Sequence, residues 1–495
     1  MSAYIGIDLG TSGVKLLLVN EGGKILGETS RAYPVLHPQE GWSEQNPEDW
    51  WSAVKDGLCE LAGKSRECIS GIAVAGQMHG LVALDGHNDV IRPCILWNDG
   101  RTGAETDYLN GVVGKEKLSS LTGNIAFAGF TAPKLLWLRK HEPENFARIA
   151  KIMLPKDYIT FRLTGNFSTD YSDASGTLLL DVKNKCWSEE MCAICGVASD
   201  MLPALYESFE PCGTVCNELC AEPGLSGRII VAAGAGDNAA AAVGTGAVAG
   251  SGCNISLGTS GTIFIPSVKF GADGGNCLHS FAHAEGKFHL MGCILSAASA
   301  NKWWTEDILS SHYGMAENRS DLLGRNGIYF LPYLCGERSP HNDVNARGAF
   351  IGMNAQTNAS DMSLAVLEGV AFAFRDCLEA AARCGIRPLH STVCGGGAKS
   401  ALWIKILANV LDMSLYVVET EQGPAYGAAM LAMVACGKYA SVEEAAKIMV
   451  KTRLAARPER RLVNLYEQRY AAFSALYPLL KGWFSQYVPK DGTAK

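Results

Sequence analysis

The five residues Leu-Gly-Thr-Ser-Gly occur twice in this chain, at 9–13 and again about half a chain later at 257–261. Each copy lies beside short apolar runs, and a Gly-Thr-Ser-Gly turn between two such runs predicts a tight hairpin. Glycine lets the backbone approach a ligand closely, and the amides and hydroxyls of the turn can bind an anion. Used twice at this spacing, the turn predicts two related lobes that clamp one nucleotide.

Asp8 lies at the end of an apolar strand predicted from Tyr4, directly before the first glycine turn. A carboxylate at a strand end beside a phosphate-binding loop can orient a hydrated Mg²⁺ ion. The alternative is an aspartate that only stabilises its own turn. The second copy has Ser256 at the corresponding position. Because a purely structural turn would not require this difference, we favour the metal-side role for Asp8.

Asp237 is the best candidate for a general base. Small residues precede it at 234–236 and follow it at 239–241, which leaves room for a substrate. We expect it where a buried strand meets the N-terminus of a helix. That position favours the ionised carboxylate, which can then accept a proton near neutral pH. An N-cap aspartate without a catalytic role is an equally good interpretation of this feature alone.

Three further motifs each leave two interpretations open. Met78-His79 follows a buried strand, where a lone histidine is more often a core residue than a ligand. The segment 97–99 (Trp-Asn-Asp) suits a carbohydrate contact but equally a capped turn. Three glycines at 395–397 lie between a strand and a helix. They allow close approach of the backbone to a flat or charged group, or merely close packing.

Two large domains are expected, because 495 residues exceed what one compact core usually holds. Strands and helices alternate in the first half, with a capped helix at 50–62 and a buried strand at 69–75. A glycine-rich stretch at 244–252 marks the boundary, and a long amphipathic helix follows at 363–384. We predict an N-terminal domain over 1–246, a C-terminal domain over 247–440 and a C-terminal helical segment over 441–495.

The composition is that of an ordinary globular protein, with 48% apolar residues, 19% charged residues and a net charge of −7. The negative charge argues against a nucleic-acid or acidic-membrane partner. No apolar run is long enough for a membrane helix, and the chain opens directly into a strand rather than a signal peptide. Seventeen scattered cysteines favour reduced thiols, and therefore a cytoplasmic location, over disulfides or a zinc site.

Taken together, these motifs resemble those of the FGGY carbohydrate kinases, within the larger group that shares the actin, hexokinase and heat-shock chaperone ATPase core. The resemblance extends from Tyr4 to about Gly437 and includes two family signatures, at 129–138 and 348–368. It implies an α/β fold of two ribonuclease-H-like domains with a nucleotide cleft between them. Departures are small, and Cys335 stands where the family usually has serine. The chain has neither the GxxxxGK[ST] phosphate loop nor the motifs of eukaryotic protein kinases.

The resemblance also implies an activity, in which the ATP γ-phosphate is transferred to a hydroxyl of a small sugar in the presence of Mg²⁺. Asp237 would accept the proton, and Asp8 would lie near Mg²⁺. The residues implied to contact the sugar are Met78, His79, Trp97, Asn98, Asp99 and Asn238. Those implied to contact ATP are Thr11, Ser12, Gly258, Thr259, Ser260, Gly396 and Gly397.

Several functions remain open at this point. The motifs are most similar to those of family members that phosphorylate D-xylulose, and kinases for ribulose, xylitol or glycerol are the alternatives of the same class. An ATP-driven protein of the actin or chaperone type, and a sugar-binding regulator without catalysis, are alternatives of different classes. The two family signatures and Asp237 argue against the first, and an intact Asp8 and Asp237 argue against the second. Homodimers are usual among similar proteins, although the sequence carries no signal for an interface.

Overall fold

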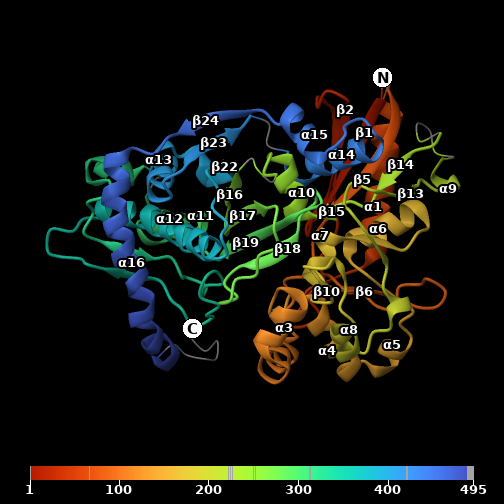
Figure 1. Ribbon diagram of the computed structural model, residues 1–495, viewed down its shortest axis with the longest axis horizontal. Coiled ribbons are helices and arrows are strands. Elements are labelled where there is room, and N and C mark those ends of the chain that lie inside the picture. The colour runs from red at the N-terminus through yellow and green to blue at the C-terminus, as the bar shows by residue number, and fades with distance from the viewer. Residues whose placement is uncertain are drawn as a thin grey trace.

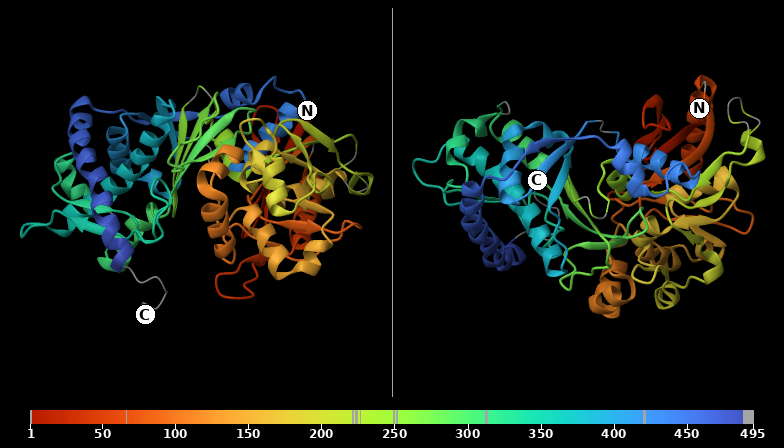
Figure 2. Two further views of the ribbon diagram at one scale, coloured as in Figure 1. Left: turned by 60° about the horizontal axis from the view of Figure 1, so that its bottom comes forward. Right: turned by 45° about the horizontal axis from the view of Figure 1, so that its top comes forward.

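The computed structural model describes residues 2–65, 67–220, 222, 225, 227–248, 250, 252–311, 314–419 and 422–487. Two lobes are each built around a mixed sheet of seven strands. Figure 1 shows the first lobe on the right and the second on the left, and Figure 2 shows the same two lobes from other sides. The predicted α/β class with two sheets is therefore confirmed.

The first sheet has the strand order β13-β14-β5-β1-β2-β3, and β15 pairs with β5 beyond the end of β14. Strand β5 is parallel to β1, β14 and β15, whereas β1 and β2 form an antiparallel hairpin. The bounds are β1 Ser2–Leu9, β2 Gly13–Asn20, β3 Ile25–Ala32, β5 Cys68–Gly76, β13 Pro211–Thr214, β14 Ile230–Ala232 and β15 Ala235–Gly236.

The second sheet has the order β18-β19-β17-β16-β22-β23-β24. Its strand β16 is antiparallel to β17 and parallel to β22, which repeats the relation of β1 to β2 and β5. The bounds are β16 Cys253–Leu257, β17 Gly261–Ser267, β18 His279–Ala282, β19 Phe288–Ile294, β22 His390–Cys394, β23 Ser414–Val418 and β24 Thr452–Ala456. The repeated arrangement is consistent with two related halves.

Both faces of the first sheet are covered, which explains why β1 is apolar along nearly its whole length. Helices α1 (Pro47–Lys64) and α6 (Pro155–Thr164) share one core with alternate residues of β1, including Ile5 and Ile7. Helices α10 (Asp237–Gly244) and α14 (Gly423–Ala435) share the opposite core with Tyr4.

Helix α14 comes from the second half of the chain but packs in the first lobe. A Cβ atom on Gly6 of β1 would lie 1.9 Å from the carbonyl oxygen of Ala425, so only glycine allows this approach. A Cβ atom on Gly427 would lie equally close to the Ala240 carbonyl oxygen of α10. Figure 1 shows α14 and the following α15 (Val442–Met449) in blue beside β1 and β2 in red. The segment predicted as a C-terminal domain therefore contributes its last helix to the first lobe.

The second sheet packs on one face against α12 (Ala359–Arg383) and α13 (Ala401–Val410), and α16 (Arg460–Tyr487) packs on these two helices. Arg469 and Tyr466 of α16 bond the two carboxylate oxygens of Glu368 on α12, each at 2.9 Å. The predicted C-terminal helical segment is corrected in one respect. It is interrupted by β24, which pairs with β23 and satisfies the backbone groups of that strand. Residues 488–495 lie outside the described part.

The opposite face of the second sheet packs against the segment between β5 and β14. Phe264 and Phe281 of the sheet share a core with Met78 and Phe130 of that segment. The segment between β5 and β14 includes β6 Val82–Leu84, β7 Cys94–Ile95, α2 Gly103–Tyr108, α3 Lys115–Thr122, α4 Thr131–His141, α5 Pro143–Ala147, β8 Lys151–Met153, α6, β9 Ser168–Asp170, α7 Tyr171–Ala174, β10 Leu180–Asp181, β11 Cys186–Trp187, α8 Glu189–Cys195 and β12 Ala204–Tyr206.

None of the described helices is both long and apolar enough to cross a bilayer.

Candidate active site

Asp8 and Asp237 approach each other at one edge of the first sheet. Strand β5 lies between β1 and β15, with Ala75 opposite Asp8 and Gly76 opposite Gly236. Asp237 follows Gly236 directly, so both acids lie at the carboxyl end of β5. Ligands of open α/β sheets bind at this end of the strands. Asp8 and Asp237 are far apart in the sequence, and the pairing of β1 and β15 with β5 brings them to one site.

The pKa values of both acids are raised. Burial raises the pKa of Asp8 to about 7, the negative charge of Asp237 adds to the effect, and Lys15 opposes it. Burial also raises the pKa of Asp237 to about 6, while the backbone N–H of Asn238 lowers it by donating to Oδ1 at 2.7 Å. Asp237 is therefore ionised above about pH 6, as a proton acceptor must be.

The turn before Asp237 depends on its two glycines. Gly234 has a φ of +79°, and a Cβ atom there would lie 2.0 Å from the Val74 carbonyl oxygen. A Cβ atom on Gly236 would lie 2.9 Å from Sδ of Met78. Gly236 is the N-cap of α10 and Asp237 is the first residue of the helix. The interpretation of Asp237 as an N-cap residue is therefore wrong, and its carboxylate is available for another role.

Met78, one of the predicted sugar contacts, lies beside the two residues that flank Asp237, and His79 follows it in the chain. Met78 is buried under Gly236, and its Sδ lies 4.0 Å from Nδ2 of Asn238, another predicted contact. Nδ1 of His79 lies 2.7 Å from the Gly176 carbonyl oxygen, so Nδ1 donates and Nε2 is left as an acceptor. Burial lowers the pKa of His79 to about 3, and the ring is neutral at physiological pH.

The Trp97, Asn98 and Asp99 side chains have different surroundings. Trp97 is 46% exposed, and its Nε1 donates to the Thr11 hydroxyl at 3.0 Å. Asn98 is exposed. The Asp99 carboxylate is buried and accepts from Arg101 on both oxygens, at 2.8 and 2.7 Å, and from the Ser43 backbone. Because protein donors occupy both oxygens, Asp99 anchors the turn rather than presenting a free carboxylate to a sugar.

A network of two buried glutamines holds the first hairpin. The Thr11 hydroxyl donates to Oε1 of Gln77 at 3.1 Å, and Nε2 of Gln77 donates to Oε1 of Gln45 at 2.9 Å. Nε2 of Gln45 returns to the Thr11 carbonyl oxygen at 2.7 Å. Sequence reasoning assigned no role to Gln45 or Gln77. Their only signal was that both lie within the span of family resemblance, which begins at Tyr4.

Replacing Gln77 by methionine is expected to loosen this hairpin. The variant keeps the volume of the side chain but removes the acceptor for the Thr11 hydroxyl, a bond of about 1 kcal/mol. If the hairpin binds phosphate, the KM for ATP rises about fivefold and the KM for the sugar is unchanged. Initial rates at varied ATP and varied sugar measure the two constants separately. An equal change in both would show that Gln77 supports the lobe in general.

The two hairpins differ in register despite their identical sequence. Leu9 pairs with Val14 in the first, whereas Leu257 pairs with Gly261 in the second. In the second hairpin the Thr259 carbonyl oxygen accepts from the backbone of Ala297 and from the Ser299 hydroxyl, at 3.1 and 2.7 Å. In the first, the glutamine network holds the turn. Identical sequences therefore form two turns of different register, and different tertiary partners hold each one.

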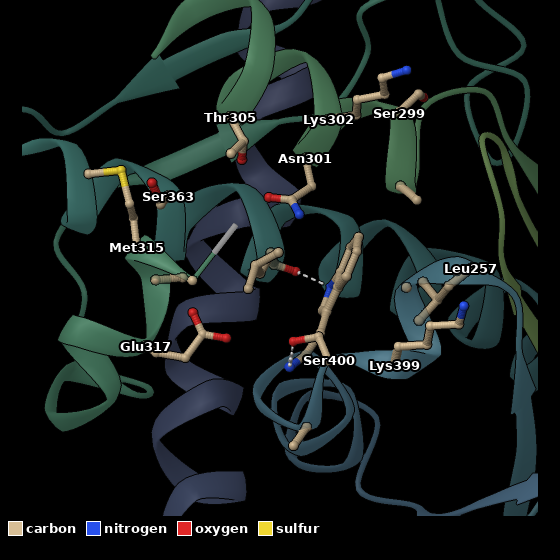
Figure 3. A pocket seen from close by; sticks show the side chains of 18 of the residues that line it. Leu257, Ser299, Asn301, Lys302, Thr305, Met315, Glu317, Ser363, Lys399 and Ser400 are labelled. Carbon is tan, nitrogen blue, oxygen red and sulfur yellow. Dashed lines mark hydrogen bonds between the residues drawn. The ribbon is translucent and has the colours of Figure 1, made fainter. Parts of the chain in front are cut away.

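A cavity of about 980 Å³ opens beside the second hairpin (Figure 3). Of the residues predicted to contact ATP, it is lined by Gly258, Thr259, Gly396 and Gly397. Ser260 is exposed on the same turn. Thr11 and Ser12 belong to the other lobe. Further lining residues that the sequence did not reveal include Ser299, Asn301, Lys302, Glu317, Lys399 and Ser400.

The cavity has features suited to a nucleotide. Its volume is at the upper end of the usual range for small-molecule sites. Figure 3 shows Asn301 and Lys302 on one side, with Lys399 and Ser400 on the other. Buried Trp403 closes the base, fixed by its Nε1 donating to the Leu367 carbonyl oxygen at 3.0 Å. Polar and basic groups around an apolar floor can accommodate phosphates and a base.

Comparisons with known proteins agree with this geometry. Residues 3–244 match the N-terminal domain model of the FGGY family of carbohydrate kinases, and residues 253–436 match the C-terminal domain model. The chain is 41% identical to a xylulose kinase of Escherichia coli, with 98% of this chain and 99% of the relative covered. It is 38% identical to a xylulose kinase of Bacillus subtilis, with coverages of 96% and 97%.

A solved structure is similar over the same extent. The crystal structure of a xylulose kinase from Rhodospirillum rubrum matches with a TM-score of 0.90 and 29% identity, covering 97% of this chain and 99% of that one. The two lobes, the paired acids at the end of β5 and the family matches over both halves lead to one conclusion. The chain belongs to the FGGY family of carbohydrate kinases.

Proposed function

We propose that the protein transfers the γ-phosphate of ATP to D-xylulose and forms D-xylulose 5-phosphate. The observation that carries the proposal is the half-buried Asp237 carboxylate at the end of β5, bonded to Asn238, which in turn lies against Met78. The choice of sugar is supported by the xylulose kinases that resemble this chain over nearly its full length. Ribulose, xylitol and glycerol remain the alternatives.

Asp237 would act as the general base. An alcohol is a weak nucleophile at pH 7, and its proton must leave as the new P–O bond forms. In this step the sugar O–H proton passes to Asp237, the sugar oxygen bonds to phosphorus, and the bond from phosphorus to ADP breaks. Nε2 of His79 is an acceptor that can bind a second sugar hydroxyl. Trp97 and Asn98 are exposed and complete the proposed pocket.

The donor set at Asp8 suits Mg²⁺. This ion usually binds one or two protein carboxylates and otherwise keeps waters and substrate phosphates. Asp8 is half-buried at the end of β1, and the next residues form the hairpin that we propose to face the phosphates, with Thr11 and Ser12. When bound, Mg²⁺ would neutralise negative charge on the phosphates. Asp8 would hold it through water or directly.

ATP would occupy the cavity beside the second hairpin, with Gly258, Thr259 and Ser260 toward the phosphates and Gly396 and Gly397 toward the adenosine. The N-terminal domain over 1–246, the C-terminal domain over 247–440 and the segment from 441 remain our division of the chain. The cytoplasmic location and the homodimer also remain predictions.

The test is coupled ADP release with D-xylulose, L-ribulose, D-ribulose, xylitol and glycerol as acceptors, with the phosphosugar identified directly. We expect the highest kcat/KM with D-xylulose. A higher value for another acceptor would reassign the sugar. ATP turnover that is independent of sugar and yields no phosphosugar would instead support the ATP-driven actin or chaperone class.

A further inference from the structure

A fully buried lysine lies among three buried aspartates behind the proposed base. Nζ of Lys156 lies 2.5 Å from Asp157, 3.0 Å from Asp170 and 3.9 Å from Asp173, and all four side chains are at most 1% exposed. Burying such charges is costly, and a well-packed apolar group is often at least as stabilising. A cluster of this kind is therefore poorly explained by stability alone.

The ammonium group remains charged within the cluster. Burial lowers the pKa of Lys156, but Asp157, Asp170 and Asp173 together raise it above its ordinary value. The Lys156 ammonium also donates to the Ala233 carbonyl oxygen at 3.3 Å. Ala233 lies between β14 and β15, so this hydrogen bond joins the Lys156 ammonium group to the segment that leads into Asp237.

A second connection reaches the residue before Asp237. The Ser172 hydroxyl donates to Oδ2 of Asp170 at 2.5 Å and accepts from the Gly236 backbone N–H at 3.1 Å. Lys156, Asp170, Ser172 and Gly236 thus form a continuous chain of polar contacts. It ends at the peptide immediately before the candidate base.

The position of Asp237 depends on this backbone. Within the described part of the chain, its carboxylate accepts hydrogen bonds from N and Nδ2 of the adjacent Asn238, at 2.7 and 3.1 Å. Strand β15 pairs with β5, and the backbone N–H of Gly236 in β15 donates to the Ser172 hydroxyl. The hydroxyl therefore helps to set the orientation of the peptide from which the Asp237 side chain projects.

We propose that Ser172, held by Asp170 and Lys156, is a positioning residue that aligns Asp237 with the sugar hydroxyl. The inference rests on the proposed function, because it assumes that Asp237 takes the proton of the acceptor sugar. Proton transfer requires heavy atoms within about 3 Å, and a displacement of about 1 Å can cost about a hundredfold in rate. The contribution of Ser172 should consequently be seen in kcat more than in sugar binding.

The chain offers a matched control. The Ser208 hydroxyl also donates to Oδ2 of Asp170, at 2.6 Å, and Ser208 is as deeply buried as Ser172. The Ser208 hydroxyl bonds Asp170, whereas the Ser172 hydroxyl bonds Asp170 and also accepts from the Gly236 backbone N–H. Ser172→Ala and Ser208→Ala therefore each remove one hydroxyl donor from the Asp170 carboxylate. Only Ser172→Ala also removes the acceptor of the Gly236 backbone N–H.

The experiment measures kcat, sugar KM and melting temperature for Ser172→Ala, Ser172→Cys and Ser208→Ala. Cysteine fills the volume of serine but is a weak hydrogen-bonding partner. We expect both Ser172 variants to lose about tenfold to a hundredfold in kcat, with sugar KM within about twofold of wild type. Ser208→Ala should keep the wild-type kcat while melting at a temperature similar to that of the Ser172 variants.

Two results would overturn the inference: an equal loss of kcat in the Ser172 and Ser208 variants, or a loss that is seen only in KM or only in melting temperature. Failure of the proposed function is distinguished by the wild-type enzyme, which would then form no phosphosugar from D-xylulose. An active wild type with unaffected Ser172 variants would refute the positioning role alone.

Discussion

Replacing Asp237 by asparagine is expected to abolish measurable phosphosugar formation while both substrates still bind. Asparagine has the shape of aspartate but cannot accept the proton of the sugar hydroxyl. General-base catalysis contributes about 10²–10⁴-fold, and we expect a loss of kcat at the upper end of this range. Single-turnover phosphosugar formation measures the loss, and isothermal titration measures binding of sugar and ATP.

The matched control for this variant is Asp181→Asn. Asp181 is also only half-buried and accepts from N and Nδ2 of a nearby asparagine, Asn184, at 3.1 and 2.8 Å. It lies on β10, outside the paired-acid site. Its replacement should leave kcat unchanged. Wild-type turnover by Asp237→Asn would remove Asp237 from the mechanism.

The pH profile gives an independent test of the same residue. Burial raises the pKa of Asp237 to about 6, so its carboxylate is protonated below that pH and ionised above it. In the free enzyme, kcat/KM should therefore fall about tenfold for each pH unit below 6. A profile that stays level down to pH 4.5 would show that no group with this pKa accepts the proton.

The residues of the proposed site are easiest to find in the sequence where a local pattern and a strand end coincide. Asp8 and Asp237 each follow an apolar strand and precede a glycine-rich turn or a run of small residues. Parallel pairing of β5 with both β1 and β15 then brings their ends together. This juxtaposition follows from the general rule that ligands bind at the carboxyl ends of parallel strands.

Features that depend on distant partners could not be predicted in the same way. Asp99 has the composition of a sugar contact, but Arg101 and the Ser43 backbone occupy its carboxylate. The identical hairpins adopt different registers because Gln45 holds one and Ser299 contacts the other. Ser43, Gln45 and Ser299 each lie more than 30 residues from the group that they contact, and local spacing carries no information about such partners.

Packing across the two halves was also hidden from local patterns. Helix α14 is an alanine-rich helix in the second half of the sequence, and local patterns place it with that half. It packs on the first sheet instead, because Gly6 of β1 has no side chain to prevent the approach. The cavity-lining residues Asn301 and Lys302 belong to a short helix, α11 (Ala298–Lys302), that carries no motif. Only the fold brings this helix to the cavity.

Replacing Gly396 by tryptophan is expected to raise the KM for ATP by about a hundredfold, equivalent to about 2.7 kcal/mol of lost binding. Gly396 lines the cavity, and a Cβ atom built on it meets no other atom within 4 Å. A large side chain would therefore project into the space that we assign to ATP. Gly397 would not give a clean test, because its Cβ atom would lie 2.9 Å from Leu257 and 3.0 Å from Trp403.

The sugar site that we propose lies in the other lobe, so sugar binding measured by titration should be unchanged in Gly396→Trp. The melting temperature should also be retained, because a Cβ atom on Gly396 meets no packed atom and the side chain extends from it into the cavity. Gly482→Trp on α16 is the control, since a Cβ atom there also meets no neighbour and the residue lies far from the cavity lining. An unchanged KM for ATP in Gly396→Trp would place the nucleotide outside this cavity. The second hairpin and the glycine turn at 395–397 both line this cavity, and that arrangement would then serve only the packing of the lobe.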